Sequence, residues 1–260
     1  MKEHISFSEL KTWDECAYKH KLAYIDDLKQ FIGNEYTAFG KAIHDTCEKA
    51  LIAAGPVNKT NFFDQRFLVE VRELKSNGVK LNPSLLKDMR KQADQILKHV
   101  LPELKEYFKD YEVISTEEKL YEPIKDIDYN FKGYVDLVLK TSDGKYHIID
   151  WKTCSWGWDS RKKSDSMLTY QLTLYKNFFA EKHSIDASNI DTHFALLKRT
   201  AKKNRVEIFK VASGPKKTEN CLKLLNKAIY NIKKKRHIKN RLSCTSGFGC
   251  EFYNTKFCSR

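Results

Sequence analysis

The sequence predicts a protein of the α/β class with a helical N-terminal portion, and two observations carry this prediction. Up to about residue 110, apolar side chains recur at the spacing of amphipathic helices. From Tyr111 onward, the pattern changes to short apolar or alternating segments typical of strands, interrupted by further helical segments. We therefore expect a single domain over residues 1–260, with a helical portion (1–110), an α/β core (111–212) and a basic helix followed by a cysteine-rich tail (213–260).

The expected elements begin and end at recognisable signals. Ser6 followed by Glu9 fits a capping box, and the helix that it opens carries apolar residues as far as Leu22. Ser142-Asp143-Gly144 predicts a hairpin turn between two strands. The other expected helices cover residues 36–54, 61–75, 83–109, 164–182 and 217–239. The expected strands cover residues 111–123, 129–140, 145–151, 192–198 and 205–211.

Charge and hydropathy narrow the range of functions. No apolar segment approaches the roughly 20 residues that a membrane span needs, so we expect no membrane partner. The N-terminus carries no secretory pattern, which predicts a cytoplasmic protein, in the host cytoplasm if a phage encodes it. A net charge of +13 favours polyanions such as nucleic acid, although a solvated basic helix would also account for part of it. The basic clusters are Lys198-Arg199, Lys202-Lys203, Arg205, Lys216-Lys217 and Lys233-Lys234-Lys235-Arg236.

The segment Asp150-Trp151-Lys152 predicts a metal-dependent phosphodiesterase centre. Asp150 and Lys152 are two residues apart on an expected strand, so their side chains leave the same face. Asp136 lies in the middle of an apolar run, residues 134–139, that looks buried on both faces, and a buried carboxylate needs a partner, a proton or a metal. Two carboxylates suit Mg²⁺ or Mn²⁺, and a lysine can stabilise charge on a phosphate. The alternative is an ordinary surface ion pair on a strand.

Three of the seven cysteines crowd into the C-terminal tail. Cys244, Cys250 and Cys258 fall within fifteen residues, and such thiols suggest soft-metal ligation. A closed site needs a fourth ligand, for which Cys16 on the N-terminal helix is the candidate. Zinc and an iron–sulfur cluster both accept four thiolates, and a terminal loop with unliganded thiols is the remaining alternative.

The ordered set of motifs resembles the RecB-type branch of the PD-(D/E)XK nuclease superfamily, which includes CRISPR adaptation nucleases and many phage exonucleases. The resemblance spans almost the whole chain and implies a restriction-endonuclease-like fold, a central mixed sheet flanked by helices. The matching segments are Ser6–Leu10 with Cys16, Phe39–His44, Gly133–Asp136, Ile149–Thr153, Gln171–Tyr175 and the C-terminal cysteines.

The resemblance also implies roles for individual residues. His44, Asp136, Asp150 and the carbonyl of Trp151 would hold the metal. Asp136, Asp150, Lys152, Gln171 and Tyr175 would form the catalytic set, with Lys152 orienting the attacking water or stabilising the phosphorane. In iron–sulfur members a lone N-terminal cysteine joins three C-terminal ones around a [4Fe–4S] cluster, which maps onto Cys16, Cys244, Cys250 and Cys258. The spacing between the last two cysteines is longer here than in the family pattern, and zinc is the alternative occupant.

The sequence therefore predicts a Mg²⁺- or Mn²⁺-dependent deoxyribonuclease, acting as an exonuclease on single-stranded DNA or duplex ends in recombination, repair or phage DNA metabolism. The chain carries no Gly-x-x-x-x-Gly-Lys-Ser/Thr phosphate loop, so any unwinding would come from a helicase or recombination partner. Two alternatives are a non-catalytic DNA-binding iron–sulfur module and a structure-specific endonuclease.

Overall fold

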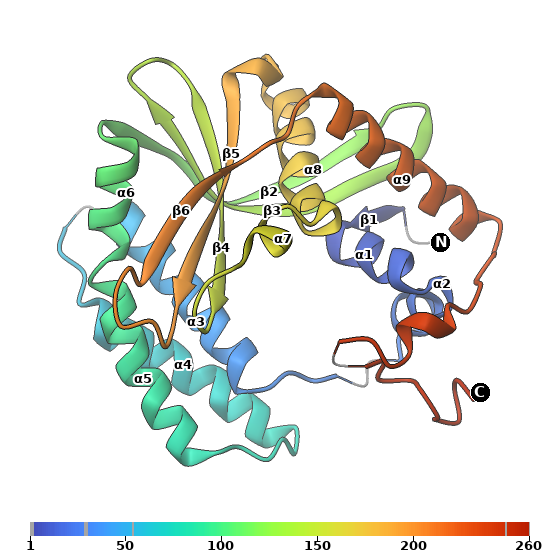
Figure 1. Cartoon of the computed structure of the whole chain (residues 1–260), viewed down its shortest axis with the longest axis horizontal. Helices are drawn as coiled ribbons and strands as arrows, with labels where there is room; N and C mark the ends of the chain where they lie inside the picture. Colours follow the sequence, from blue (N-terminus) through green and yellow to red (C-terminus); the bar gives the residue numbers. More distant parts are fainter. Residues whose placement is uncertain (1–2, 29–30, 54, 248, 260) are drawn as a thin grey trace. The chain divides into compact units, whose positions relative to one another are not determined.

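A computed structural model describes residues 3–28, 31–53, 55–247 and 249–259 of the chain (Figure 1). The described chain forms two compact units. The central unit comprises Ile32–Leu120 and Tyr134–Ser213. The terminal unit comprises Met1–Phe31, Tyr121–Gly133 and Gly214–Arg260, so it gathers both ends of the chain. Each unit is described below on its own.

A mixed β-sheet forms the core of the central unit. β3 pairs antiparallel with β4, β4 pairs parallel with β5, and β5 pairs antiparallel with β6. The strands are β3 (Ile127–Thr141), β4 (Tyr146–Cys154), β5 (Ile190–Lys198) and β6 (Val206–Val211). A parallel pair needs a crossover connection, which α8 (Ser166–His183) supplies between β4 and β5 after the short α7 (Ser160–Lys163). β2 (Tyr111–Ile124) also pairs with β3.

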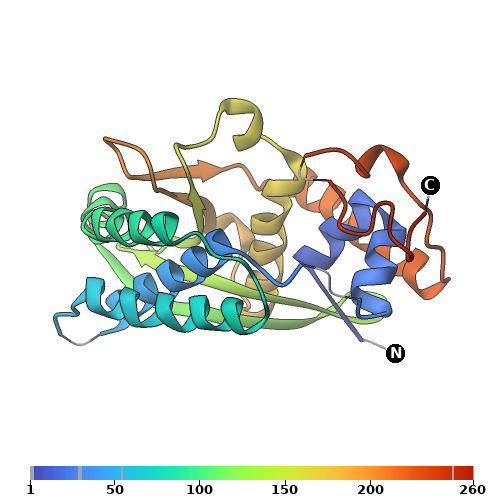
Figure 2. The same ribbon diagram turned by 90° about the horizontal axis from the view of Figure 1, so that it is seen from below.

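Helices cover both faces of this sheet. Leu137, Ile149 and Trp151 pack in one core with four helices of the N-terminal half. These helices are α3 (Glu35–Ile52), α4 (Lys59–Ser76), α5 (Pro83–Leu97) and α6 (Val100–Phe108). On the opposite face of β4, the Tyr146 ring packs against Phe179 of α8, at 6.2 Å between ring centroids. The prediction of an α/β fold with a mixed central sheet between helices is confirmed, as Figures 1 and 2 show.

One predicted helix of the central unit is wrong in its extent. The segment 83–109 forms two helices, because α5 ends at Leu97 and α6 begins at Val100. Pro102 lies in the first turn of α6, where its missing N–H is tolerated. In an uninterrupted helix its ring would clash with the carbonyl of Lys98, so the break falls just before it. The predicted end of the helix over 36–54 lies outside the described residues, and α3 itself ends at Ile52.

The terminal unit is built around the N-terminal helix and the long C-terminal helix α9 (Pro215–Lys233), which pack together. Ser6 caps α1 (Phe7–Glu15) by accepting a hydrogen bond from the Glu9 N–H, which is one of the two bonds of the predicted capping box. The predicted continuous helix breaks at Cys16, which has an extended backbone, and resumes as α2 (Ala17–His20) and a short π-helix (Lys21–Ile25). The strand β1 (His4–Ser6), parallel to the first half of β3, is not predicted from the sequence.

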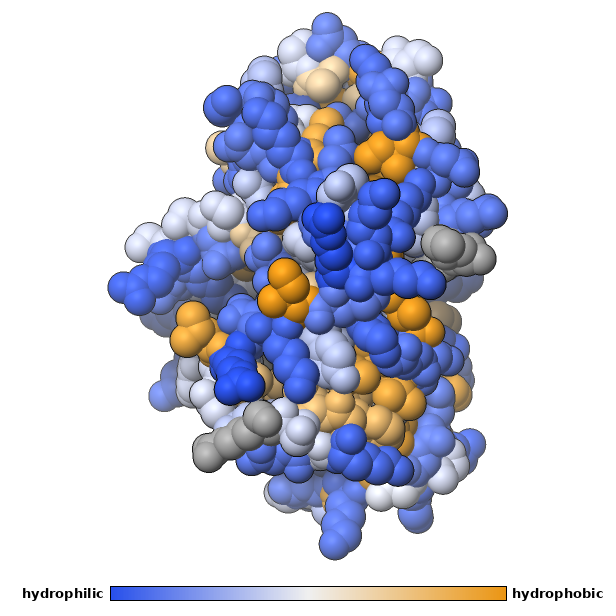
Figure 3. All heavy atoms as spheres, turned by 90° about the vertical axis from the view of Figure 1, so that its right-hand side faces the viewer, coloured by the Kyte–Doolittle hydropathy of each residue, from blue (hydrophilic) through white to orange (hydrophobic). Residues whose placement is uncertain are grey.

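The C-terminal helix is shorter than predicted. α9 ends at Lys233 instead of residue 239, and Lys235 takes a left-handed backbone conformation. The face in Figure 3 is mostly hydrophilic, and its hydrophobic residues form several patches, the broadest of them in the lower half of the view. None of the described helices is both long enough and apolar enough to cross a bilayer.

Candidate active site

Strand pairing in the central unit brings the two predicted carboxylates together. Leu137 pairs with Ile149 in the antiparallel register, so Asp136 falls opposite Asp150. Asp150 is only 1% exposed. The Oδ2 atom of Asp136 accepts a hydrogen bond of 2.8 Å from the backbone N–H of Trp151. The run around Asp136 is buried as expected, except at Tyr134, which is exposed.

Lys152 connects the carboxylates to α8. Its Nζ lies 2.6 Å from Oδ2 of Asp150 and donates a 2.9 Å hydrogen bond to Oε1 of Gln171. Gln171 in turn donates from Nε2 to the hydroxyl of Tyr175, one helical turn later. The geometry at Asp150 Oδ2 is that of a close ion pair, because this buried oxygen receives no well-directed hydrogen bond from the described residues. The lysine is therefore held between an acid and an amide.

His44 reaches the same carboxylates from α3. Its Nδ1 lies 3.7 Å from Oδ2 of Asp136, which is too long for a hydrogen bond. Burial lowers the pKa of His44 to about 4, against the opposing influence of Asp150. At neutral pH the imidazole is uncharged, which is the form that binds a metal ion. α3 is fixed at its start by a capping box between Asn34 and Thr37.

Burial, and then the charge of Asp150, raise the pKa of Asp136 well above its usual value. Two carboxylates with few compensating charges resist simultaneous ionisation. Burial also raises the pKa of Tyr175, which keeps this residue a neutral phenol. The carboxylate pair therefore carries an energetic cost that a bound cation would relieve.

Sequence reasoning missed a third acidic side chain near this pair. The pKa of Glu117 is raised by burial and then by the charge of Glu48, with a smaller contribution from Asp150. Glu117 lies within β2 at a φ of 47°, a left-handed conformation that is unusual for a non-glycine residue in a strand. Its sequence context, Ser-Thr-Glu-Glu-Lys, carries no signal of this bend.

The donors fit a hard divalent cation in their chemistry. Asp136 and Asp150 offer carboxylate oxygens, one of them buried without a directed hydrogen bond, and neutral His44 offers a nitrogen. The Trp151 N–H contacts Asp136, and the role of the Trp151 carbonyl as a metal ligand stays a prediction. Among the described residues, however, no three His, Cys, Asp or Glu side chains are close enough together to hold a metal ion.

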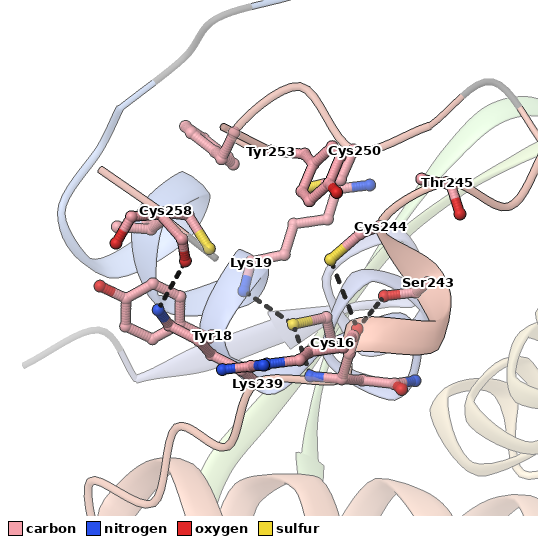
Figure 4. A pocket seen from close by; sticks show the side chains of 15 residues that line it. Cys16, Tyr18, Lys19, Lys239, Ser243, Cys244, Thr245, Cys250, Tyr253 and Cys258 are labelled. Atoms are coloured by element: carbon pink, nitrogen blue, oxygen red, sulfur yellow. Dashed lines mark hydrogen bonds between the residues drawn. The ribbon is translucent and has the colours of Figure 1, made fainter. Parts of the chain in front are cut away.

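The four predicted cysteine ligands line one pocket of the terminal unit (Figure 4). The pocket has a volume of about 240 Å³, and the Lys19 side chain runs through it between Cys16 and Cys250. The sulfur of Cys16 accepts backbone N–H groups of Lys19 at 3.5 Å and Asn240 at 3.3 Å. The tail turns back on itself through a 2.9 Å hydrogen bond from Cys250 N to the carbonyl of Cys244. The thiols thus share one pocket without ligating geometry in the described part of the chain.

The fold and the site together define the class of protein, a mixed α/β sheet with two carboxylates and a lysine on neighbouring strands. The family model of the PD-(D/E)XK nuclease superfamily matches residues 4–254. The chain belongs to this superfamily.

A likeness to solved structures supports the fold. A crystal structure from Eubacterium rectale named "Putative exonuclease" has a TM-score of 0.58 and 11% sequence identity, covering 94% of this chain and 86% of that one. At this identity the likeness shows the fold alone. A structure named SSO0001 covers 85% of this chain and 96% of its own length at 15% identity, but its TM-score of 0.38 carries no argument. No curated protein sequence matches the chain.

Proposed function

We propose that the protein is a Mg²⁺- or Mn²⁺-dependent deoxyribonuclease of the RecB-type branch, acting as an exonuclease. One observation supports this proposal above all others, namely that Asp136 and Lys152 both converge on the buried Asp150. A cluster with this energetic cost is typical of a catalytic centre. An ordinary surface ion pair, the alternative from the sequence, would be exposed to solvent.

The residues of the site have separate tasks in hydrolysis. In the reaction a water oxygen forms a bond to phosphorus, the bond from phosphorus to the leaving sugar oxygen breaks, and that oxygen takes up a proton. A bound divalent cation supplies a water of lowered pKa and compensates charge on the phosphate. Asp136, Asp150, neutral His44 and the Trp151 carbonyl would hold it. The ammonium of Lys152 faces the developing negative charge on the phosphate oxygens.

Gln171 and Tyr175 position the catalytic lysine. Gln171 accepts from Lys152 and donates to Tyr175, so the three side chains form a short hydrogen-bonded series from α8 to β4. The raised pKa of Tyr175 keeps its hydroxyl protonated and able to take part at neutral pH. This series would hold the ammonium in place when a phosphate displaces Asp150 as its partner.

For the terminal unit we propose a [4Fe–4S] cluster held by Cys16, Cys244, Cys250 and Cys258, with zinc as the alternative occupant. Three features support it: the four thiols line one pocket, the pocket has room for a small inorganic group, and backbone N–H groups point at the Cys16 sulfur. Such N–H groups stabilise thiolate ligands. Ligation would require the sulfurs to close around the group.

The substrate follows from charge and from the catalytic centre. A net charge of +13 favours DNA, and we propose single-stranded DNA or duplex ends, with a helicase or recombination enzyme as partner. The alternatives from the sequence are a DNA-binding module without activity and a structure-specific endonuclease.

The test is cleavage of end-labelled linear DNA with Mn²⁺ by the wild-type protein and the variants Asp150→Ala and Lys152→Ala. We expect both variants to lose activity, and Asp110→Ala, which removes an exposed ion-paired carboxylate, to retain it. Intact DNA after incubation with the wild-type protein, or full activity in both variants, would exclude the proposal. Circular single-stranded DNA separates the two modes of cleavage, because only an endonuclease opens it.

A further inference from the structure

The loop that leaves β4 presents an unusually exposed aromatic side chain. Trp156, two residues after the end of the strand that carries Asp150 and Lys152, is 74% exposed. It is the most exposed aromatic side chain in the described part of the chain. One exposed ring needs no explanation by itself, so the case for a function rests on the loop that holds Trp156 and on the residues beside it.

This exposure belongs to a loop that is held on both sides. Before Trp156, Ser155 is tied by its carbonyl to Thr200, through a backbone bond of 2.9 Å and a side-chain bond of 2.8 Å. After it, Trp158 packs against the rings of Phe194 and Phe209. The intervening Gly157 has a φ of +144°, which a side chain rarely permits. The fixed residues on either side therefore hold Trp156 in an exposed position.

A buried arginine accompanies the tryptophan without an acidic partner. Arg199 is only 9% exposed, and its guanidinium donates to the neutral oxygens of Ser155 and Gln92. It stacks on Tyr36, 4.7 Å from the ring centroid. Among the described residues no carboxylate forms an ion pair with it. A desolvated guanidinium of this kind suits a phosphate oxygen.

The loop lies close to the catalytic strand. Lys152 and Trp156 are four residues apart, so their Cα atoms are at most about 14 Å apart at ~3.6 Å per residue. A DNA strand with one phosphate at Lys152 would need only a few nucleotides to bring a base to the indole. Lys162 of α7, 4.9 Å from the Trp158 ring centroid, adds positive charge beside this loop.

We propose that Trp156 stacks on an unpaired base while Arg199 holds a neighbouring phosphate, so that the pair selects single-stranded DNA next to the active site. Bases in a duplex already stack on one another, and only an unpaired or terminal base offers a free face to the indole. The proposal names the substrate of the nuclease site and rests on that proposed function, but its test does not require cleavage.

The experiment measures binding of a fluorescein-labelled twelve-nucleotide thymidine strand by anisotropy, in EDTA so that no hydrolysis occurs. Trp156→Ala should weaken binding about 5- to 150-fold, the range for losing one stacked base. Trp156→Phe should restore most of the affinity, and Tyr107→Ala, which removes another exposed aromatic ring of the central unit, should bind like wild type. Equal affinities for wild type and Trp156→Ala would overturn the proposal.

Three further measurements identify the contact. Closed circular duplex DNA, which has no terminal base, should bind Trp156→Ala and wild type with equal affinity. A strand of abasic sites should also bind the two proteins with equal affinity. A loss that is equal for all three ligands would overturn the proposal, since it would reflect general damage. Arg199→Gln should lower the slope of log affinity against log salt by about one, as for one lost phosphate contact. An unchanged slope in a variant that melts like wild type would exclude the arginine's role.

Failure of this inference is distinguishable from failure of the nuclease proposal. Hydrolysis of bis(p-nitrophenyl) phosphate with Mn²⁺ has no base to stack, so Trp156→Ala should hydrolyse it at the wild-type rate. If the wild-type protein cleaves neither this substrate nor end-labelled DNA but the binding pattern holds, the nuclease proposal fails and the stacking site stands. If hydrolysis is intact and binding is indifferent to Trp156, the stacking site fails alone.

Discussion

The two candidate sites of this chain are assembled in different ways. In the central unit, Asp136 and Asp150 lie opposite each other because β3 and β4 pair in one register, and Lys152 follows on the same strand. In the terminal unit, Cys16 comes from a break between two helices and its three partners come from the irregular tail. Hydrogen-bond ladders fix the first site, whereas turns and caps hold the second.

This difference has an energetic consequence. Register places the two acids together whether or not a cation is present, so the folded protein bears the cost of their proximity, visible in the raised pKa of Asp136. The cysteine pocket bears no such repulsion between acids, because its thiols are apart and the charged side chains that line it, Lys19, Lys239 and Arg241, are cations. We expect the first site to be prepared before its ligand binds and the second to be completed by its ligand.

The largest expected effect tests this preparation at the acidic site. Asp136→Asn should lower cleavage at least about 100-fold, since the variant loses a charge that serves the transition state. In EDTA at pH 7 the same variant should be more stable than wild type by roughly 1 kcal/mol, because it removes a buried acid while keeping an oxygen for the Trp151 N–H.

The pH dependence of the free energy of unfolding tests the cost of burying Asp136 independently. Because the pKa of Asp136 is raised in the folded state, the folded protein binds more protons than the unfolded chain. The contribution of Asp136 to the free energy of unfolding therefore falls as pH rises above the ordinary value of 3.8. Urea denaturation at several pH values measures it. A variant that is inactive and also less stable than wild type at every pH would contradict a prepared site. Mg²⁺ should stabilise the wild type and not the variant.

The next effect concerns the cysteine pocket. Cys16→Ser should abolish the bound iron or zinc and lower the melting temperature by several degrees, because the ligand would no longer join the N-terminal helices to the tail. Hydrolysis of a small phosphodiester should survive, since the acidic cluster lies wholly within the other unit. The measurement is metal content by elemental analysis, with an absorption band near 400 nm expected for iron–sulfur.

Cys221→Ala is the control for that experiment. Cys221 is buried in α9 and does not line the pocket, so its removal should leave the metal content unchanged. Full metal content in Cys16→Ser would remove this cysteine from the ligand set and leave the tail cysteines to explain any bound metal.

The same contrast explains how much of the molecule the sequence could predict. The pairing of Asp136 with Asp150 was foreseeable, because strand alternation and a short hairpin determine which residues meet. The one-turn relation of Gln171 and Tyr175 was equally foreseeable, and their hydrogen bond follows it. Local periodicity thus predicts contacts within one helix or strand and contacts between the two strands of a hairpin.

Contacts that depend on irregular backbone were not foreseeable. Glu117 comes near the acidic site through a left-handed residue inside a strand, and Cys16 enters its pocket because a helix breaks there. The break between α5 and α6 did have a signal, Pro102, which the helical periodicity of the surrounding residues overrode. Long-range pairing such as β1 with β3 depends on packing that no local pattern contains.

A smaller effect is expected from a buried histidine pair in the sheet that carries the acidic site. His147 of β4 and His193 of β5 lie 3.2 Å apart between ring nitrogens. Burial lowers the pKa of both, to about 3 for His193. Because the unfolded chain binds their protons below about 6.5, the stability that they contribute is present above that pH and is lost as pH falls toward the folded-state value.

Lowering the pH from 7.5 to 5 should reduce the free energy of unfolding by about 2 kcal/mol through His193, as measured by urea denaturation. His193→Gln should flatten that part of the profile. An unchanged profile would mean that acid loosens the protein elsewhere first, and the sheet would then not be the acid-sensitive part of the central unit.

The smallest effect separates helix stability from site geometry. Asn34 and Asn82 cap α3 and α5 in the same way, each accepting two backbone N–H groups. Either change to Ala should cost about 1 kcal/mol in denaturation experiments. Only α3 carries His44, so Asn34→Ala should also weaken Mn²⁺ binding by calorimetry, whereas Asn82→Ala should not. If both variants bind Mn²⁺ like wild type, the strands alone prepare the site, and the histidine joins it only after the cation has bound.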